Sequence, residues 1–154
     1  MEQLKNRILN CTACELHKTR QHAIWGEGNP GAEVLLIGEA PGAEEDRIGR
    51  PFVGKSGQLL DKILAACGFS RQNHVFLSNI LRCRPLGNRV PKDEEVQACI
   101  PFLYEQIRLV DPRIVIPLGA TALKRLMNDD GLRITRLRGN WIPWEGRLVM
   151  PVYH

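Results

Sequence analysis

The sequence predicts an α/β fold of three layers, α/β/α, with a central and mainly parallel four-stranded sheet. Four short β-rich runs carry this prediction, at 34–38, 75–80, 114–118 and 148–152, and three of them are continuously apolar. Continuous apolar runs are typical of strands that are covered on both faces of a sheet. Helical patterns separate the runs, and strands that alternate with helices favour parallel pairing.

Three helices are expected between and after these strands, at 56–67, 92–110 and 120–127. The first has an apolar stripe that includes Cys67, and Gly68 follows as a stop signal. We expect Cys67 to be a small buried hydrophobic residue on that stripe. The second helix opens with three acidic residues at 93–95, which suit a helix N-terminus, and Pro101 is expected to kink or restart it.

Composition places the chain among ordinary globular proteins. Its 154 residues fit one domain, 1–154, and 44% of them are hydrophobic while 25% are charged. No apolar run is long enough for a membrane span, and the N-terminus lacks the pattern of a secretory signal, so we expect a cytoplasmic, intracellular protein. The net charge of +4 is compatible with a polyanionic partner but does not require one.

The cysteines indicate a metal site. The chain has five of them, an odd number, and four form two pairs: Cys11-Thr-Ala-Cys14, and Cys83 with Cys99. In an intracellular chain such spacing favours metal binding over disulfides. Four thiolates can hold either a zinc ion or a 4Fe-4S cluster, and the spacing does not distinguish between them.

One motif suggests a different function. Residues 49–56 match the phosphate-binding pattern G-x-x-x-x-G-K-[ST], with Lys55 at its lysine position. A phosphate-binding loop leaves directly from a buried strand, but here the preceding strand ends near Gly38 and acidic residues at 44–46 lie between. The chain also lacks a good apolar strand that ends in an aspartate for magnesium. Nucleotide hydrolysis is therefore an alternative that we rank below the interpretation that follows.

Several short motifs follow one another along the chain: Gly38-Glu-Ala-Pro-Gly42, Glu44-Glu-Asp46, Gly49-Arg-Pro-Phe-Val-Gly54, Asn79, Cys83-Arg-Pro85 and Pro151-Val-Tyr-His154. In this order, and together with four of the cysteines, they resemble the family 4 uracil-DNA glycosylases over almost the whole chain. The resemblance implies an enzyme that flips uracil out of DNA and hydrolyses its N-glycosidic bond. It also implies a structural 4Fe-4S cluster, with zinc as the less favoured alternative, held by Cys11, Cys14, Cys83 and Cys99.

A base-binding pocket can then be assigned residue by residue. A base inside a duplex must be extruded before its glycosidic bond can be reached, so the pocket must hold one flat ring. We expect Phe52 to stack on that ring. The Asn79 amide can donate to uracil O4 and accept from N3–H, which distinguishes uracil from cytosine. The backbone around Ala40 and Gly42 would line the same pocket, because glycine allows close approach to a ligand.

The expected catalytic groups are one histidine and two glutamates. Bond cleavage leaves negative charge on the uracil ring, and His154 matches the family histidine that would donate to O2. Glu45 or Glu39 is the candidate for positioning the attacking water or shaping the pocket, and the sequence does not divide these roles. With water as the nucleophile, no lysine is needed, so we expect a monofunctional enzyme that leaves an abasic site. The segment 86–91 has no histidine of the kind that traps DNA covalently in a related branch.

Contacts with uracil-containing DNA are expected around the mouth of the pocket, by a protein that acts as a monomer. The candidates that neutralise or contact phosphates are Lys55, Arg82, Arg84, Asn88, Arg89 and Arg138.

The resemblance also raises an expectation about the C-terminal region. Family members continue past the last histidine with a loop that wedges into DNA and a final helix, whereas this sequence stops at His154. We expect the domain to lack that loop and helix, which would leave part of one sheet face exposed. A second interpretation is therefore a non-catalytic iron-sulphur or zinc module that binds nucleic acid.

Overall fold

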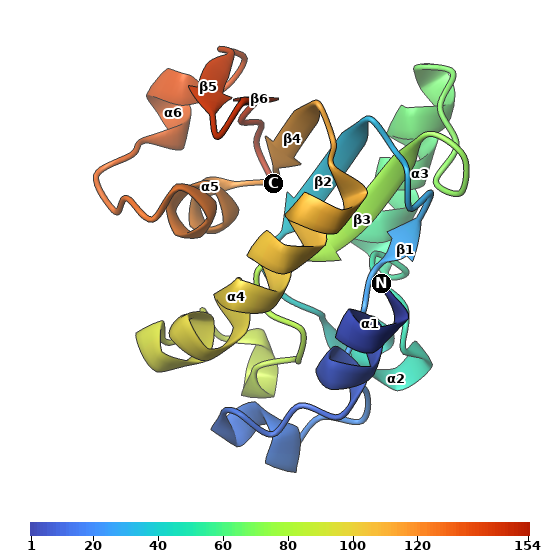
Figure 1. Cartoon of the computed structure of the whole chain (residues 1–154), viewed down its shortest axis with the longest axis vertical. Helices are drawn as coiled ribbons and strands as arrows, with labels where there is room; N and C mark the ends of the chain where they lie inside the picture. Colours follow the sequence, from blue (N-terminus) through green and yellow to red (C-terminus); the bar gives the residue numbers. More distant parts are fainter.

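A computed structural model describes all residues, 1–154, and has one six-stranded sheet at its centre (Figure 1). The strands lie side by side in the order β1-β3-β2-β4-β6-β5. Their bounds are β1 Glu27–Gly28, β2 Val34–Gly38, β3 Val75–Asn79, β4 Ile114–Pro117, β5 Ile142–Trp144 and β6 Arg147–Val149.

The predicted α/β class and the parallel core are confirmed. Strands β3, β2, β4 and β6 pair in parallel and correspond to the four predicted runs. The predicted number of four strands is wrong, because β1 and β5 add antiparallel edges to the sheet. These edge strands have two and three residues, too few to show a periodic pattern. Strand β6 is also shorter than predicted, since Val152 makes only an isolated bridge with Leu118.

The helices follow the predicted alternation. Pro101 was predicted to kink or restart helix α4, and the helix does not restart there, because it runs unbroken through this residue. Proline removes one backbone N–H donor, and the buried side chains along α4, such as Leu103 and Ile107, hold the helix together across that loss. The helices are α1 Glu2–Leu9, α2 Ala43–Ile48, α3 Lys55–Ala66, α4 Asp93–Val110, α5 Ala120–Met127 and α6 Ile134–Leu137, with 3₁₀ turns at Glu15–Lys18 and Leu86–Asn88.

The two faces of the sheet carry cores of unequal size. On one face, Leu35, Ile37 and Val115 belong to a large cluster with residues of α4 and α5. On the other, Leu36 and Leu77 form a small cluster with α3. Figure 1 shows α4 in front of the sheet and α3 behind it, so the sheet is the middle of three layers.

The face under α3 is only partly covered. Leu148 of β6 is 43% exposed, and Leu59 and Ile63 of α3 are also exposed. Cys67 at the end of α3 is exposed too, so the prediction that it is buried is wrong. Of the apolar stripe that carries Cys67, only Leu60 and Leu64 pack against the sheet. None of the helices is both long enough and apolar enough to cross a membrane.

Candidate functional site

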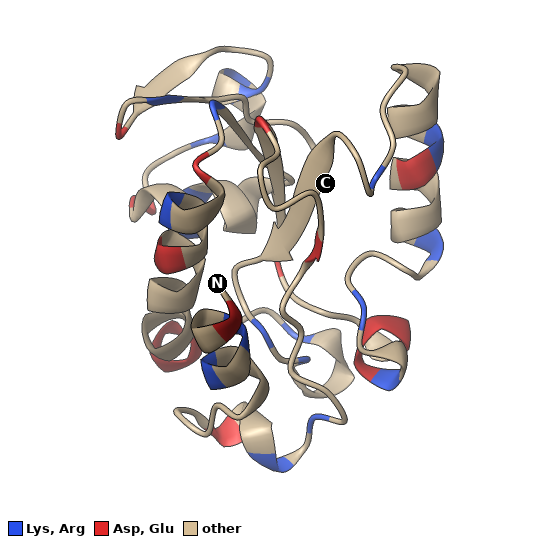
Figure 2. Cartoon of the chain, turned by 45° about the vertical axis from the view of Figure 1, so that its right-hand side comes forward, with Lys and Arg blue, Asp and Glu red and all other residues tan.

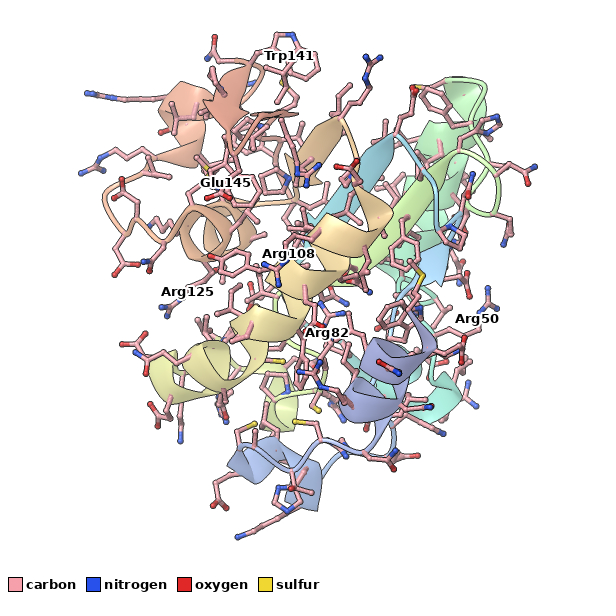
Figure 3. All side chains as sticks on the ribbon, in the orientation of Figure 1. Arg50, Arg82, Arg108, Arg125, Trp141 and Glu145 are labelled. Atoms are coloured by element: carbon pink, nitrogen blue, oxygen red, sulfur yellow. The ribbon has the colours of Figure 1, made fainter.

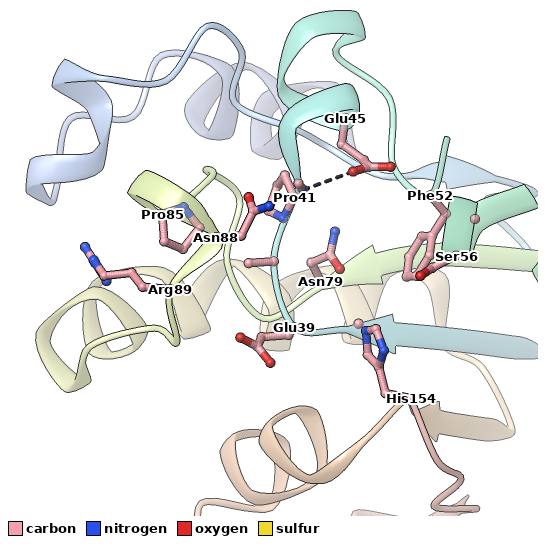
Figure 4. A pocket seen from close by; sticks show the side chains of 14 residues that line it. Glu39, Pro41, Glu45, Phe52, Ser56, Asn79, Pro85, Asn88, Arg89 and His154 are labelled. Atoms are coloured by element: carbon pink, nitrogen blue, oxygen red, sulfur yellow. Dashed lines mark hydrogen bonds between the residues drawn. The ribbon is translucent and has the colours of Figure 1, made fainter. Parts of the chain in front are cut away.

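A cavity of about 360 Å³ lies at the carboxyl ends of β2 and β3 (Figure 4). The chain adds β3 on one side of β2 and then β4 on the other, and such reversals open a crevice at the carboxyl end of the sheet. The volume suits a small molecule, because such sites measure about 300–1,000 Å³. The cavity is lined by Gly38, Glu39, Ala40, Pro41, Gly42, Glu45, Phe52, Ser56, Gly57, Asn79, Pro85, Asn88, Arg89 and His154.

The amide of Asn79 and the ring of Phe52 meet at Gly38, the last residue of β2. Asn79 ends β3 directly opposite Gly38 in the parallel register, and 95% of its surface is buried. A Cβ on Gly38 would lie 2.5 Å from Asn79 Oδ1 and 2.7 Å from Phe52 Cζ. Glycine is therefore required at this position, since any side chain would push the amide and the ring apart.

Phe52 is held in an unusual backbone conformation. Its φ is +53°, in the left-handed region that residues with a Cβ rarely adopt. The guanidinium of Arg71 donates to the carbonyls of Pro51, at 2.7 Å, and Phe52. Gly57 of α3 allows this turn, because a Cβ there would lie 1.9 Å from the Phe52 carbonyl oxygen. Both contacts fix the Phe52 ring at the wall of the cavity.

Glu45 of α2 connects two walls of the cavity through its carboxylate. Oε2 accepts hydrogen bonds from the backbone N–H groups of Val53, at 2.8 Å, and Gly54, at 2.7 Å. Oε1 accepts from the Gly42 N–H at 3.0 Å (Figure 4, dashed line). Two of these donors, Val53 and Gly54, belong to the loop at 49–56 that matched the phosphate-binding pattern. A carboxylate of the protein occupies the place of a phosphate, which argues against nucleotide binding there.

Glu39 and His154 approach the cavity from the side opposite Glu45. Figure 4 shows Glu39 directly after β2 and His154 below the cavity. Gly119 makes room for the histidine: its φ is +96°, and a Cβ on it would lie 2.9 Å from His154 Cβ. Tyr153 is exposed beside His154, with the guanidinium carbon of Arg138 4.7 Å from its ring centroid. Arg138, one of the cations predicted to contact DNA, thus lies against the residue that precedes His154.

The loop after Cys83 supplies further polar groups. Asn88 and Arg89 line the cavity, and Asn88 Oδ1 accepts a hydrogen bond from Arg84 Nε at 2.8 Å. Arg89 forms a bidentate ion pair with the carboxylate of Glu95, at 2.8 and 2.6 Å. Hydrogen bonding to this guanidinium lowers the pKa of Glu95. Three predicted DNA contacts therefore gather on one loop.

Two other predicted DNA contacts lie elsewhere. Lys55 is exposed at the start of α3 but does not line the cavity. The prediction for Arg82 is wrong, because this residue is only 1% exposed and cannot reach a phosphate (Figure 3). Its charge suggested a surface residue, whereas its side chain is buried against the end of β3, where it binds Ser78 and the Asn79 carbonyl. Figure 2 shows that the positions of Lys and Arg are scattered along the helices and loops of the chain.

The four cysteines predicted as metal ligands surround one small cavity. Cys11 and Cys14 are half-buried between α1 and the first 3₁₀ turn, while Cys83 and Cys99 are buried. Burial raises the pKa of the Cys83 thiol, and raises that of Cys99 to about 11. Cations lie beside them, since Arg20 Nη1 donates to Cys83 Sγ at 3.3 Å. No three histidine, cysteine or acidic side chains lie close enough together to share a single ion.

Sequence reasoning missed some residues that line the cavity. Ser56 belongs to the motif that was set aside as a phosphate-binding pattern, and Pro85 follows Cys83 in a quoted motif. Arg71 was missed entirely. Its contacts with Pro51 and Phe52 bring together segments about 20 residues apart, and no local pattern indicates such a contact.

Comparisons with known proteins agree with this arrangement. A family model described as the uracil DNA glycosylase superfamily matches residues 25–154. The chain is 43% identical to the type-4 uracil-DNA glycosylase of Thermotoga maritima, over all of this chain and 80% of that protein. It is 47% identical to the type-4 enzyme of Pyrobaculum aerophilum, over 89% of this chain and 69% of the relative. A type-5 uracil-DNA glycosylase of Thermus thermophilus is 37% identical over 70% of this chain and 55% of the relative.

Proposed function

This chain belongs to the uracil-DNA glycosylase superfamily, and we propose that it is a monofunctional uracil-DNA glycosylase of the iron-sulphur type, acting as a monomer on DNA inside the cell. One observation carries the proposal: a single cavity combines an aromatic ring, a buried asparagine amide and a histidine, from Phe52, Asn79 and His154. These groups can stack on a flipped base, read its edge and stabilise the charge that it acquires.

Recognition of uracil would use the Asn79 amide and the Phe52 ring, which meet at Gly38. The amide of Asn79 offers one donor and one acceptor, which match O4 and N3–H of uracil but not the reversed pattern of cytosine. Discrimination is strong at such a site, because a mismatched base leaves buried polar groups without partners. The ring of Phe52 supplies a flat apolar wall for stacking, and stacking on an aromatic side chain contributes about 1–3 kcal/mol.

We assign the bond-breaking step to His154 and Glu39. As the C1′–N1 bond breaks, its electron pair stays on the uracil ring, and an N–H of His154 stabilises the charge at O2. Glu39 would orient a water molecule toward C1′ and take up its proton. Glu45 is a positioning residue in this mechanism, since its carboxylate already accepts three backbone hydrogen bonds.

We assign the cysteine cavity to a 4Fe-4S cluster, as the family resemblance implies, with a zinc ion as the alternative. Zinc binds its ligands at about 2.0–2.3 Å and so draws them together, whereas each iron of a cluster takes one thiolate. Four cysteines around one cavity would offer one thiolate to each iron of a cluster. A bound cluster would cross-link the N-terminal segment to the β3–α4 region through Cys11, Cys14, Cys83 and Cys99.

Binding of DNA would use the loop that carries Asn88 and Arg89 together with Arg138 on the opposite side. Asn88 and Arg89 line the cavity, and Arg138 lies against Tyr153, the residue before His154. These groups could contact the backbone on either side of an extruded nucleotide. Phosphate contacts of this kind fix the register of the DNA but do not read its sequence.

The proposal is tested by uracil release from a labelled single-stranded oligonucleotide, measured as alkali-sensitive cleavage with anaerobically purified protein. We expect release by the parent protein and its loss in Asn79→Ala. Asn73→Ala is the matched control, because Asn73 is exposed just before the opposite end of β3.

The two outcomes are easily separated. Folded, iron-loaded parent protein that binds the oligonucleotide without releasing uracil would be a nucleic-acid-binding module, and the proposed activity would be wrong. If Asn79→Ala still releases uracil, the proposed glycosylase activity would stand, but Asn79 would not be the residue that reads the base.

A further inference from the structure

Arg82 is a buried cation between the two sites described above. It lies three residues after Asn79 and one residue before Cys83, and its side chain is almost completely enclosed. It helps to line the cysteine cavity, and its backbone N–H donates to Cys99 Sγ at 3.2 Å. The proposed mechanism gives this residue no role.

The guanidinium of Arg82 binds the end of β3. It donates to the hydroxyl of Ser78, at 2.7 Å, and to the backbone carbonyl of Asn79. Further bonds reach the carbonyl of Trp25, at 3.0 Å, and the side-chain oxygen of Gln106, at 3.3 Å. The planar fork of an arginine can hold several acceptors at fixed angles, which a lysine cannot do. The guanidinium therefore fixes the backbone from which the Asn79 amide projects.

The charge of Arg82 is not balanced by these contacts. All four acceptors are neutral oxygens, and Nε is buried without any hydrogen-bond partner. A buried cation without a compensating anion is costly. Two of the predicted cluster ligands adjoin this cation: Cys83 follows it in the chain, and Cys99 Sγ accepts a hydrogen bond from its backbone N–H. Thiolates bound to a cluster would supply that negative charge.

A short and tightly bonded segment joins the two sites. After Asn79, the backbone N–H of Ile80 donates to the Gly38 carbonyl at 2.9 Å, and that of Leu81 to the Glu39 carbonyl at 3.1 Å. Because Arg82 directly precedes Cys83, a shift of the cysteines would move Arg82. The end of β3 at Asn79, which the guanidinium binds, would move with it.

We propose that Arg82 is a positioning residue through which the cysteine site holds the amide of Asn79 in place for reading uracil. The inference rests on the proposed function, because it gives Asn79 the role of base reader. It predicts that substitutions at Arg82 act through Asn79 and not through general loss of folding.

A double-mutant cycle on binding tests this proposal without requiring turnover. The iron-loaded protein would be titrated with an oligonucleotide that carries 2′-fluorinated deoxyuridine, a uracil nucleotide that resists hydrolysis, and with a cytosine version, whose edge has the reversed donor and acceptor pattern. We expect Arg82→Lys to weaken the uracil preference by about ten- to hundredfold, as for loss of one or two charge-assisted hydrogen bonds. The double variant Arg82→Lys/Asn79→Ala should have the same uracil preference as Asn79→Ala alone, because the effects of coupled residues are not additive.

A distant arginine and a second variant complete the design. Arg147→Lys, which alters an arginine paired with Asp111 at 2.6 Å, should leave the preference unchanged. If Arg82→Lys does not fold or load iron, Ser78→Ala removes one acceptor of the guanidinium without changing any charge. We expect a severalfold loss that also disappears in the Asn79→Ala background.

The results divide cleanly. Effects of Arg82→Lys or Ser78→Ala that multiply with that of Asn79→Ala would overturn the proposal, since both residues would then act independently of the amide. Unchanged uracil preference in a folded, iron-loaded Arg82→Lys would overturn it as well. Absence of uracil release by the parent would count against the glycosylase, but the binding cycle would remain readable.

Discussion

Two glutamates of the cavity should respond differently to the same substitution, one with a loss of stability and the other with a loss of activity. Glu45 accepts backbone hydrogen bonds from Gly42, Val53 and Gly54, at 2.7–3.0 Å. Glu39 lines the same cavity and is half-exposed, without such a role in holding the backbone. Changing each to glutamine preserves shape and removes the charge. The pair therefore separates support of the cavity from chemistry within it.

The cost of Glu45→Gln can be worked from these bonds. A glutamine can present its oxygen to Val53 and Gly54, but its NH₂ group then faces the N–H of Gly42, and two donors cannot bond. Hydrogen bonds to a charged group contribute about 1.5–3 kcal/mol each. Losing one bond and weakening two should lower the free energy of unfolding by about 2–4 kcal/mol. That is a large share of the roughly 5–15 kcal/mol that stabilises a domain.

For Glu39→Gln we expect no measurable change in stability and a fall in kcat of about 100-fold or more, typical of a lost general base. Urea denaturation followed by circular dichroism gives the free energy of unfolding, and single-turnover uracil release gives the rate of the chemical step. The reasoning would be refuted by a Glu45→Gln protein of unchanged stability. It would equally fail if Glu39→Gln released uracil at the parent rate.

Three further substitutions probe the cavity, one ion pair and the cysteine site. Gly38→Ala would place a methyl carbon 2.5 Å from Oδ1 of Asn79, the proposed base reader. Affinity for uracil DNA should therefore fall at least tenfold in a binding titration, about what one lost base contact costs. The guanidinium of Arg89 lowers the pKa of the Glu95 carboxyl below its ordinary value of 4.5. The ion pair therefore stabilises the folded protein above pH 4.5, and this stabilisation is lost as pH falls through the folded-state pKa. The urea midpoint of Glu95→Gln should decline less on acidification than that of the parent. Cys99→Ser should lose iron and melt at a lower temperature, while Cys67→Ser, at an exposed cysteine, should keep the iron content and melting temperature of the parent. Elemental analysis that finds zinc in the parent would contradict the cluster.

Local patterns in the sequence predicted the parallel core well. The runs at 34–38 and 114–118 became β2 and β4 almost to the residue, because continuous apolar runs leave few alternatives to a doubly covered strand. Most of the predicted pocket residues also meet in one cavity, since strand ends of a parallel sheet converge on one edge. The edge strands β1 and β5 were missed because strands so short are set by pairing and not by periodicity.

Burial of charged and polar side chains could not be predicted in the same way. Arg82 and Arg84 stand on either side of Cys83 and look alike in the sequence, yet Arg82 is enclosed beneath β3 while Arg84 pairs with Asn88 near the surface. The direction of each side chain depends on the path of the backbone through Ile80 and Leu81, which is fixed by bonds to β2.

The sequence by itself determined the chemistry that this protein can bring together: four thiols, an amide at a strand end, an aromatic ring and a terminal histidine. Residue type and order are enough for that, because parallel strands deliver their ends to one edge of the sheet. Only the tertiary structure decided which groups are free to react. Glu45 is bound by three backbone donors and Glu39 is not, because hydrogen-bond partners distant in sequence are fixed when the loops close around them, and no local pattern records that geometry.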